Sequence, residues 1–476
     1  MDFYLTNTQS RKKELFIPQK KGVVTMYQCG PTLYWSQHIG NLRSVVLSDF
    51  IVRSLDAHEY KVNFVRNYTD VGHLTGDNIG DADSGIDRME KAAQREDISP
   101  KEIAQKYRTQ FESDITALNT LKPTHTPSAT EYISQMQEFI STLLEKGFAY
   151  STPLAIYFDI TKIDNYAKLS GQMIDELIDD SGHGTVKDSG KKNQQDFGLW
   201  FFKAGTHADA LQTWPSPFVS HGTENGEGFP GWHIECSTMA HALLGETLDI
   251  HMGGIEHVSI HHTNEIAQSE AAHDGKEYAH YWLHNEHLLV DNSKMAKSSG
   301  TAYTLDDLIE KNFSPLDLRY FFMQAHYRSK QNFTWEALKS SQIALRRLRE
   351  SAQKLSADKG SLNEKYYNLF LKALADDINT PQALATVHSI MKSDISDADK
   401  RRTIEKCDEV LQIDIFNSNK DNLEIDIPDN VILLANDRLI ARKNKDWQRS
   451  DELRNVIYDL GYDILDTTDS YTLSPR

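Results

Sequence analysis

The spacing of apolar residues near the N-terminus predicts a strand, a helix and a second strand in succession. After a polar lead-in that ends at about Pro18, residues 23–27 form a short, β-branched apolar run typical of a buried strand. From Gly40 to about Leu55, apolar positions recur at helical spacing: Leu42, Val45, Val46, Phe50 and Ile51. A second strand is expected at residues 62–65. This βαβ unit places its first turn at the carboxyl end of the sheet, where such folds bind ligands.

Further along, the pattern indicates helices and short strands. We expect a helical run over residues 88–118 and an amphipathic helix over residues 129–147. Short strands are expected at Tyr150 and at residues 155–158. Residues 126–228 are interpreted as an insertion that interrupts the nucleotide-binding fold.

Strand-like runs return in the second half of the chain and are followed by a long helical region. The sheet is expected to resume near Trp232 and to include strands at residues 247–250 and 288–290. Residues 338–411 have the apolar spacing of antiparallel helices in a bundle. The last segment is expected to hold one basic helix and strand-like ends. Residues 174–196, acidic and then rich in Gly and Lys, are expected to be mobile.

These patterns predict an α/β chain with several domains. A Rossmann-type nucleotide-binding catalytic domain, split by an insertion, is followed by an α-helical bundle and a small C-terminal α/β module. The expected boundaries are 1–125 with 229–270 for the catalytic domain, 126–228 for the connective insertion, 271–332 for a junction, 333–415 for the bundle and 425–476 for the C-terminal module.

Composition narrows the possible classes of protein. A length of 476 residues suits several domains. The formal net charge of −18 argues against a basic surface coat, although a local basic stripe can still hold RNA. The sequence has neither an apolar stretch long enough to span a membrane nor a secretory pattern at the N-terminus. Three cysteines do not make a disulfide framework in so long a chain, which favours a reducing cytoplasm.

Two short motifs could bind a nucleotide phosphate. The turn after the first strand reads His38-Ile-Gly40-Asn41 and opens a helix, whose free amide groups suit an anion. It lacks both common glycine-rich phosphate loops, and on its own the tetrapeptide is a weak signal. A loop after a later apolar strand reads Lys294-Met-Ala-Lys297-Ser298. A solvated basic turn is the usual interpretation of such a loop, yet its position also suits a phosphate clamp.

A metal site is the second candidate chemistry. Cys29 and Cys236 are isolated cysteines for which a buried packing role is the simplest interpretation. His261 and Glu265 are four residues apart and share one face if their segment is helical. Two thiolates, one imidazole and one carboxylate form a plausible tetrahedral zinc set. His262 competes with His261 for the imidazole position. The remaining candidates are assigned to polar loops or packing: His233, His251, His257 and Cys407.

Together these motifs resemble a known family. The segments at His38–Asn41 and Lys294–Ser298 are similar to the two signatures of class I aminoacyl-tRNA synthetases. Cys29-Gly-Pro-Thr, Gly231-Trp-His-Ile-Glu-Cys236 and His261-His-Thr-Asn-Glu265 narrow the resemblance to the cysteinyl-tRNA synthetase family. The resemblance extends from about Tyr27 to the C-terminus.

The resemblance implies a zinc ion and an ATP site. It selects His261 over His262, so that the implied zinc ligands are Cys29, Cys236, His261 and Glu265. Coordination of the substrate thiol would separate cysteine from the nearly isosteric serine. His38 and Lys297, assisted by Lys294, would stabilise charge on the α-phosphate of ATP, which is used with Mg²⁺.

The resemblance also implies contacts to the remaining parts of the substrates. Gly40, Asn41, Gly253, Gly254 and Glu256 would bind ATP with Lys297, and Trp232 would pack on the amino-acid side chain. Glu256 stands where the family more often has Asp, Met252 where it usually has Gly, and Ala296 where Ser is commoner. The positions that match anticodon contacts to tRNA(Cys) are Arg442, Trp447, Asp451 and Asp466. An aromatic residue among basic ones suits stacking on an unpaired base.

The expected function is therefore that of a monomeric, cytoplasmic cysteine–tRNA ligase whose partners are L-cysteine, ATP and tRNA(Cys). Two alternatives stand beside it. A cysteine ligase of the mycothiol-pathway type shares the adenylating site and zinc but lacks the anticodon module, so the basic helix around Trp447 speaks against it. A non-catalytic RNA-binding paralogue would not need His38, Lys294, Lys297 and a complete zinc set.

Overall fold

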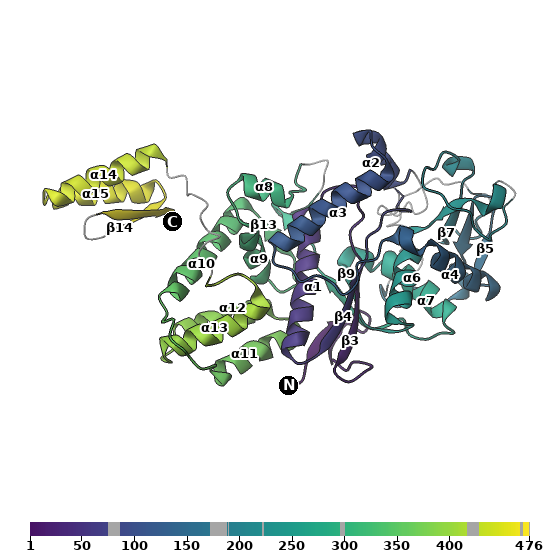
Figure 1. Cartoon of the computed structure of the whole chain (residues 1–476), viewed down its shortest axis with the longest axis horizontal. Helices are drawn as coiled ribbons and strands as arrows, with labels where there is room; N and C mark the ends of the chain where they lie inside the picture. The colour runs from purple at the N-terminus through teal and green to yellow at the C-terminus, as the bar shows by residue number, and fades with distance from the viewer. Residues whose placement is uncertain are drawn as a thin grey trace.

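The computed structural model describes residues 1–74, 86–171, 188, 190–220, 223–295, 300–416, 428–466 and 470–475. Figure 1 shows a central α/β body, an insertion on one side, a helical bundle on the other, and a small module at the C-terminal end. Within the described ranges, no helix is both long and apolar enough to cross a membrane.

The central sheet is parallel and has the strand order β10, β9, β3, β4. These strands are β3 (Val23–Gln28), β4 (Lys61–Arg66), β9 (Leu248–Gly254) and β10 (Ala279–Asn285). Helix α1 (Ile39–Ala57) connects β3 to β4 and confirms the predicted βαβ unit. Because all four strands run the same way, their carboxyl ends meet at one edge of the sheet.

Alternation along the strands gives this sheet two apolar faces. Met26 and Phe64 pack on the side of α1, whereas their neighbours Tyr27 and Val65 point to the opposite side. That opposite side is covered by α6 (Trp232–Leu244) and α7 (His261–Ala272). The sheet was expected to resume near Trp232, but this residue begins a helix.

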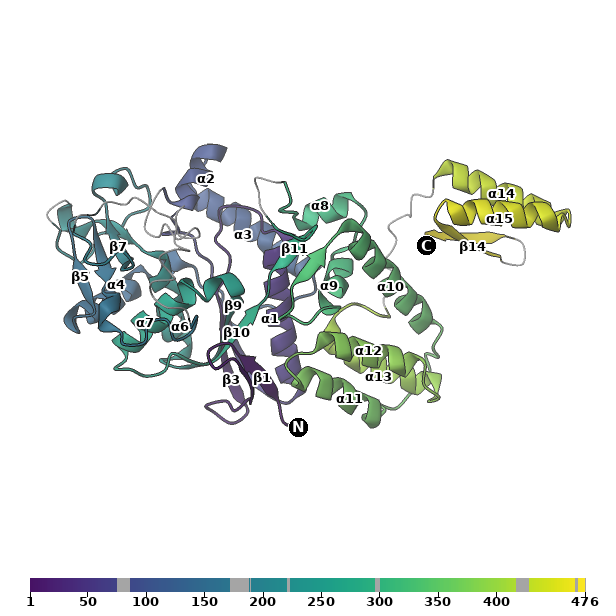
Figure 2. The same cartoon turned by 180° about the vertical axis from the view of Figure 1, so that it is seen from behind.

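The predicted polar lead-in at the N-terminus is wrong. Residues Tyr4–Asn7 and Lys12–Leu15 pair as an antiparallel hairpin, β1 and β2. Phe3 and Leu5 are buried, while Lys12 and Lys13 point to solvent. The hairpin lies beside β10 (Figure 2), where the amide of Thr8 donates to the carbonyl of Trp282 at 2.9 Å.

The predicted helical run over 88–118 is divided into α2 (Arg88–Glu96) and α3 (Pro100–Ala117). Asp97 adopts a left-handed conformation with φ of 56°, which ends α2. Ser99 then caps α3 through a reciprocal capping box with Glu102, and Pro100 occupies the first helical position.

The insertion is a small α/β unit. After a 3-10 turn, η1 (Ala129–Tyr132), the predicted amphipathic helix forms as α4 (Ile133–Glu145). An antiparallel sheet follows in the order β5 (Ala149–Ser151), β6 (Ala155–Phe158), β7 (Phe197–Phe202) and β8 (Gly228–Pro230). Short 3-10 turns occur at η2 (Ile160–Lys162), η3 (Gly205–His207) and η4 (Glu224–Gly226). Most of the segment 174–196 lies outside the described residues.

A short sheet and a helical bundle follow the central sheet. Strand β11 (Leu288–Val290) pairs with β12 (Ser293–Lys294) and with β13 (Gln331–Phe333). Helices α8 (Leu305–Glu310) and α9 (Pro315–Met323) lie between β12 and β13 in sequence. The predicted bundle is present as α10 (Trp335–Gln353), α11 (Glu364–Ala375), α12 (Thr380–Met391) and α13 (Asp397–Leu411). Its apolar core is continuous with that around α1.

The C-terminal module has its own small core. Helices α14 (Asp429–Lys443) and α15 (Trp447–Asp459) pack on the hairpin β14 (Tyr462–Asp466) and β15 (Tyr471–Pro475). The sequence predicted one basic helix here, whereas the basic residues are divided between two. The polar turn at 444–446 separates the two helices, and Asp446 caps the second by accepting from the amide of Arg449 at 3.1 Å.

Candidate metal centre and adjoining motifs

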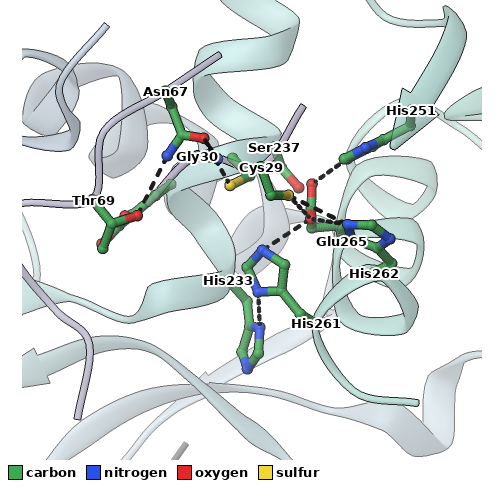
Figure 3. A network of polar contacts seen from close by, with 12 residues as sticks. Cys29, Gly30, Asn67, Thr69, His233, Ser237, His251, His261, His262 and Glu265 are labelled. Carbon is green, nitrogen blue, oxygen red and sulfur yellow. Dashed lines mark hydrogen bonds and ion pairs between the residues drawn. The ribbon is translucent and has the colours of Figure 1, made fainter. Parts of the chain in front are cut away.

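The four predicted metal ligands meet at one place. Cys29 directly follows β3, Cys236 lies in α6, and His261 and Glu265 lie one turn apart in α7. One potential ligand atom from each residue lies within 4.8 Å of all the others. Figure 3 shows the side chains of Cys29, His261 and Glu265 pointing toward one another. Segments separated by more than two hundred residues in sequence therefore form one cluster.

Glu265 is the most highly connected member of this cluster and is fully buried. Its Oε1 atom lies 3.1 Å from Nε2 of His261 and accepts from Sγ of Cys29 at 3.4 Å. Its Oε2 atom contacts Nε2 of His251 at 2.9 Å and accepts from the hydroxyl of Tyr278 at 3.1 Å. Oε2 is thus held by His251 and Tyr278, whereas Oε1 faces Cys29 and His261.

Ionisation in the cluster favours a charged carboxylate. Burial alone would raise the pKa of Glu265, but His251 and His261 hold it well below its usual range. Burial would lower the pKa of His261, yet Glu265 and Cys236 raise it to about 10. Burial would likewise raise the pKa of Cys236, but Cys29 and His261 lower it to about 6. A positive charge on the imidazole of His261 therefore balances negative charge that a divalent cation could balance instead.

The donor chemistry of the cluster fits a zinc ion. Two sulfurs, one nitrogen and one carboxylate oxygen are common zinc donors, and four is the usual number in a closed site. The Nε2 atom of His261 is close to Glu265 but makes no aligned hydrogen bond, so this buried nitrogen is available as a ligand. On the other side of the ring, Nδ1 of His261 contacts Nδ1 of His233 at 3.0 Å and is held by it.

His262 remains close enough to compete with His261. Its Nε2 atom lies 3.3 Å from Sγ of Cys29. Cys29, His251, His262 and Glu265 form a second group whose donor atoms also lie within 4.8 Å of one another. The two groups share Cys29 and Glu265. Burial and the neighbouring histidines, His251 first among them, lower the pKa of His262 well below its usual value.

The assignment of His251 and His233 to polar loops is wrong, because His251 lies fully buried in β9 and His233 is buried in α6. His257 lies in the 3-10 turn η5 (Ile255–His257) between β9 and α7, as expected for a loop residue. His251 and His233 touch predicted ligands directly. The available sequence signal was that His251 directly follows the strand expected at residues 247–250.

Trp232 lies between two imidazole rings. Its ring stacks on His73 with 4.3 Å between centroids and on His261 with 4.1 Å. The other side of His73 is fixed by a 2.7 Å contact between its Nδ1 atom and the hydroxyl of Thr32. Trp232 therefore adjoins the metal cluster, and His73 is a further site residue that the sequence analysis did not identify.

The two motifs with phosphate-binding potential adjoin each other at the start of α1. His38 is the N-cap of this helix, and its Nδ1 atom accepts from the amide of Asn41 at 3.3 Å. A Cβ atom at Gly40 would lie 2.9 Å from Cε of Met295, so the lysine segment packs closely on this glycine. The amide of Ile39 donates to the carbonyl of Tyr303 at 2.8 Å. Lys294 is exposed at the end of β12, and Lys297 lies outside the described residues.

The glycine pair at the end of β9 is tightly surrounded. A Cβ atom at Gly253 would lie 2.7 Å from Cε1 of His262, and one at Gly254 would overlap the carboxylate of Glu256. Glu256 itself is exposed, with its Oε2 atom 3.8 Å from Nδ1 of His287. The carboxylate therefore lies directly over the glycine backbone at the carboxyl edge of the sheet. Contact of these residues with adenosine stays a prediction.

The predicted tRNA-contact residues are all in the C-terminal module. Arg442 on α14 pairs with Asp466 at the end of β14, with 2.5 Å between Nη1 and Oδ1. Arg438 binds the same carboxylate through both of its terminal nitrogens. Trp447 begins α15 and is 60% exposed, and Asp451 is exposed one turn further along.

Comparison with known proteins places this arrangement in a family. Residues 15–343 match the family model described as the class I tRNA synthetase (C) catalytic domain. A cysteine–tRNA ligase of Treponema denticola is 38% identical, with 97% of each chain covered. Cysteine–tRNA ligase 1 of Burkholderia lata is 39% identical, covering 99% of this chain and 97% of the relative.

Solved structures show the same fold at low sequence identity. A methionyl-tRNA synthetase of Mycobacterium tuberculosis, bound to methionyl-adenylate, aligns with a TM-score of 0.54 and 13% identity over 82% of this chain and 90% of its own. LeuRS of Agrobacterium radiobacter K84, in a ternary complex, aligns with a TM-score of 0.58 and 10% identity over 84% of each chain. With its matched catalytic domain and its nearly full-length relatives, the chain belongs to the cysteine–tRNA ligase family of class I aminoacyl-tRNA synthetases.

Proposed function

We propose that the chain activates L-cysteine with ATP and Mg²⁺ to cysteinyl-adenylate and transfers the cysteinyl group to the 3′-terminal adenosine of tRNA(Cys). The observation that carries this proposal is the convergence of Cys29, Cys236, His261 and Glu265 at the carboxyl edge of a parallel sheet. The names of the relatives in Treponema denticola and Burkholderia lata support it.

Zinc is the proposed metal, held by Cys29, Cys236, His261 and Glu265. When bound, it would supply a soft Lewis acid that prefers the thiol of cysteine to the hydroxyl of serine. A cavity matched only in shape would separate these two amino acids weakly. The protein's own contribution is to hold the donors in a buried cluster and to orient His261 through His233.

Adenylate formation is assigned to the two motifs at the start of α1. His38, Lys294 and Lys297 are proposed to stabilise the negative charge that develops on the α-phosphate as the amino-acid carboxylate attacks. The contact of Met295 with Gly40 supports this assignment, because it brings the lysine segment to the helix start. The proposed ATP contacts are Gly40, Asn41, Gly253, Gly254, Glu256 and Lys297.

The remaining contacts are assigned to opposite ends of the molecule. Trp232 is proposed to line the amino-acid site beside His261, which its ring stacks against. The proposed tRNA contacts are Arg442, Trp447, Asp451 and Asp466. The proposed domain boundaries are 1–125 with 229–270, 126–228, 271–332, 333–415 and 425–476. We also propose that the enzyme is a monomer and works in the cytoplasm.

Cysteine-dependent exchange of pyrophosphate into ATP, measured alongside charging of tRNA(Cys), tests the proposal. The purified chain is expected to catalyse both reactions with cysteine and neither efficiently with serine. Exchange without tRNA charging would favour a ligase that joins cysteine to another acceptor. Loss of both in a folded, metal-loaded chain would leave only an RNA-binding role. The C-terminal module and the complete cluster speak against these two alternatives.

A further inference from the structure

Asn67 contacts both cysteine-bearing segments of the metal cluster. It directly follows β4 and is fully buried. Its Oδ1 atom accepts from the amide of Gly30 at 2.8 Å and from Sγ of Cys236 at 3.8 Å. Figure 3 shows Asn67 on the side of the thiols opposite the histidine rings. One side-chain carbonyl therefore links the loop after β3 to helix α6.

The orientation of this amide is fixed by its other end. Nδ2 of Asn67 donates to the hydroxyl of Thr69 at 3.3 Å. That hydroxyl is committed as an acceptor, because its own proton goes to Oε2 of Glu235 at 3.0 Å. The buried Glu235 directly precedes Cys236 in α6, so the chain of bonds closes on the same helix.

The backbone that follows Cys29 is also held close to the end of β4. A Cβ atom at Gly30 would lie 1.6 Å from the backbone oxygen of Asn67, so only glycine permits this approach. Thr69 also donates its amide to the carbonyl of Pro31 at 3.1 Å and accepts from the amide of Leu33 at 3.0 Å. The segment that follows Cys29 is thus clamped along the end of β4.

We propose that Asn67 is a positioning residue that holds the thiols of Cys29 and Cys236 at the separation required by one metal ion. The metal-binding part of this inference depends only on the chain, and its effect on the choice between cysteine and serine rests on the proposed function. Partners just outside a metal's ligands typically change its affinity 10- to 100-fold, because they fix ligand orientation. Asn67 contacts Cys236 directly and reaches Cys29 through the backbone amide of the next residue, Gly30.

Three substitutions of Asn67 separate the role of the acceptor oxygen from that of the side-chain volume. Asn67→Asp keeps an oxygen opposite the Gly30 amide, whereas Asn67→Ala removes it, and Asn67→Leu removes it while filling the space. The full-length chain is stripped of metal and titrated with Co²⁺, and the thiolate-to-cobalt absorption band is followed. Asn63→Ala is the matched control, because Asn63 lies in β4, four residues before Asn67, and takes no part in the contacts between Asn67 and Gly30 or Cys236.

We expect Co²⁺ affinity to fall about 10- to 100-fold in Asn67→Ala and Asn67→Leu, and by about threefold or less in Asn63→Ala. Asn67→Asp keeps the acceptor but loses the N–H donor to Thr69, so its loss should be smaller than that of Asn67→Ala. Zinc release to a chelator should accelerate in the same order. Unchanged affinity in Asn67→Ala, or equal losses in all three Asn67 variants, would overturn the proposal. So would failure of both Ala and Leu variants to fold, because Asn67 would then support the fold itself.

The amino-acid measurement is made on the same proteins. In pyrophosphate exchange, the ratio of kcat/KM for cysteine to that for serine should fall in Asn67→Ala and recover in Asn67→Asp. If the wild-type chain showed no exchange with cysteine, the proposed function would fail while the Co²⁺ result still decided the role of Asn67. A lower melting temperature with normal Co²⁺ binding would indicate a merely structural side chain.

Discussion

The Nε2 atom of His261 and the Oε1 atom of Glu265 lie 3.1 Å apart, one helical turn from each other and fully buried. Among the described residues, Nε2 of His261 makes no hydrogen bond in this geometry, while Oε1 of Glu265 accepts from Sγ of Cys29 at 3.4 Å. A buried acid of this kind is costly unless its charge is matched. The pair is therefore best understood as half of a ligand set for a cation.

Replacing Cys236 with serine should remove the metal and most cysteine activation. The hydroxyl is a weaker zinc ligand than the thiolate, while the change in volume is small. We expect less than about a tenth of the wild-type exchange rate, because the substitution removes a metal ligand and not merely a residue that contacts one. Metal content and pyrophosphate exchange are measured together. Cys407→Ala is the control, because this third thiol is buried in the bundle and should affect only stability.

Substituting Gly40 should slow adenylate formation and leave the metal in place. A new Cβ atom would press on Cε of Met295 at 2.9 Å and displace the start of the lysine segment. Gly40→Ala is expected to lower the exchange rate about tenfold or more, which corresponds to a rise of about 1.4 kcal/mol or more in the activation barrier. The double variant with Met295→Ala should recover part of the loss. If the double variant were as slow as Gly40→Ala, contact with Met295 would not be the cause.

Trp447→Ala should impair tRNA charging alone. Its ring is 60% exposed at the start of α15, where an unpaired base could stack on it. Loss of one stacked base costs about 1–3 kcal/mol, or roughly 5- to 150-fold in kcat/KM for tRNA. Cysteine-dependent exchange should be unchanged. Val456→Ala, exposed on the same helix, is the control, and equal effects of the two variants would contradict a specific contact.

Asp87 should make the stability of the chain depend on pH. Burial, and then the charge of Glu90, raise the pKa of Asp87 from 3.8 to about 7. The folded chain retains this proton to a higher pH than the unfolded chain does. The stability that protonated Asp87 contributes is therefore full below the unfolded-state pKa and is lost as pH rises through about 7.

Asp87→Asn tests this linkage. The amide cannot ionise, but its oxygen can still accept from the amides of Met89 and Glu90, as Oδ1 of Asp87 does. We expect the variant to be more stable than wild type at pH 8, by at most about 4 kcal/mol for three pKa units, and similar near pH 4. Free energies of unfolding in urea measure this difference. An identical pH profile in both proteins would contradict it.

The sequence predicted well those features that depend on local spacing. The βαβ unit followed from the apolar pattern around β3, α1 and β4. Residue type and helical spacing made the four donors plausible, and the family resemblance selected His261 over His262. The N-terminal hairpin was missed because β2 is polar, and its short partner buries little beyond Leu5. Helix α6 was not recognised because apolar and polar residues are mixed around it and it carries no amphipathic pattern.

The second layer of the site could not be predicted from spacing. His251 approaches Glu265 only because β9 pairs with β3 and α7 packs on that face of the sheet. His73 and Asn67 reach the cluster through the loop after β4, which crosses the start of α6. These contacts depend on strand order and helix packing, which a single sequence does not specify.

X-ray absorption at the zinc edge of the purified full-length chain, with and without L-cysteine, tests the central claim most directly. We predict one zinc per chain with two sulfur neighbours in the free protein and three when cysteine is bound, and no increase with serine. A chain that contained no zinc after growth and purification in its presence, or a sulfur count that did not change with cysteine, would contradict the account.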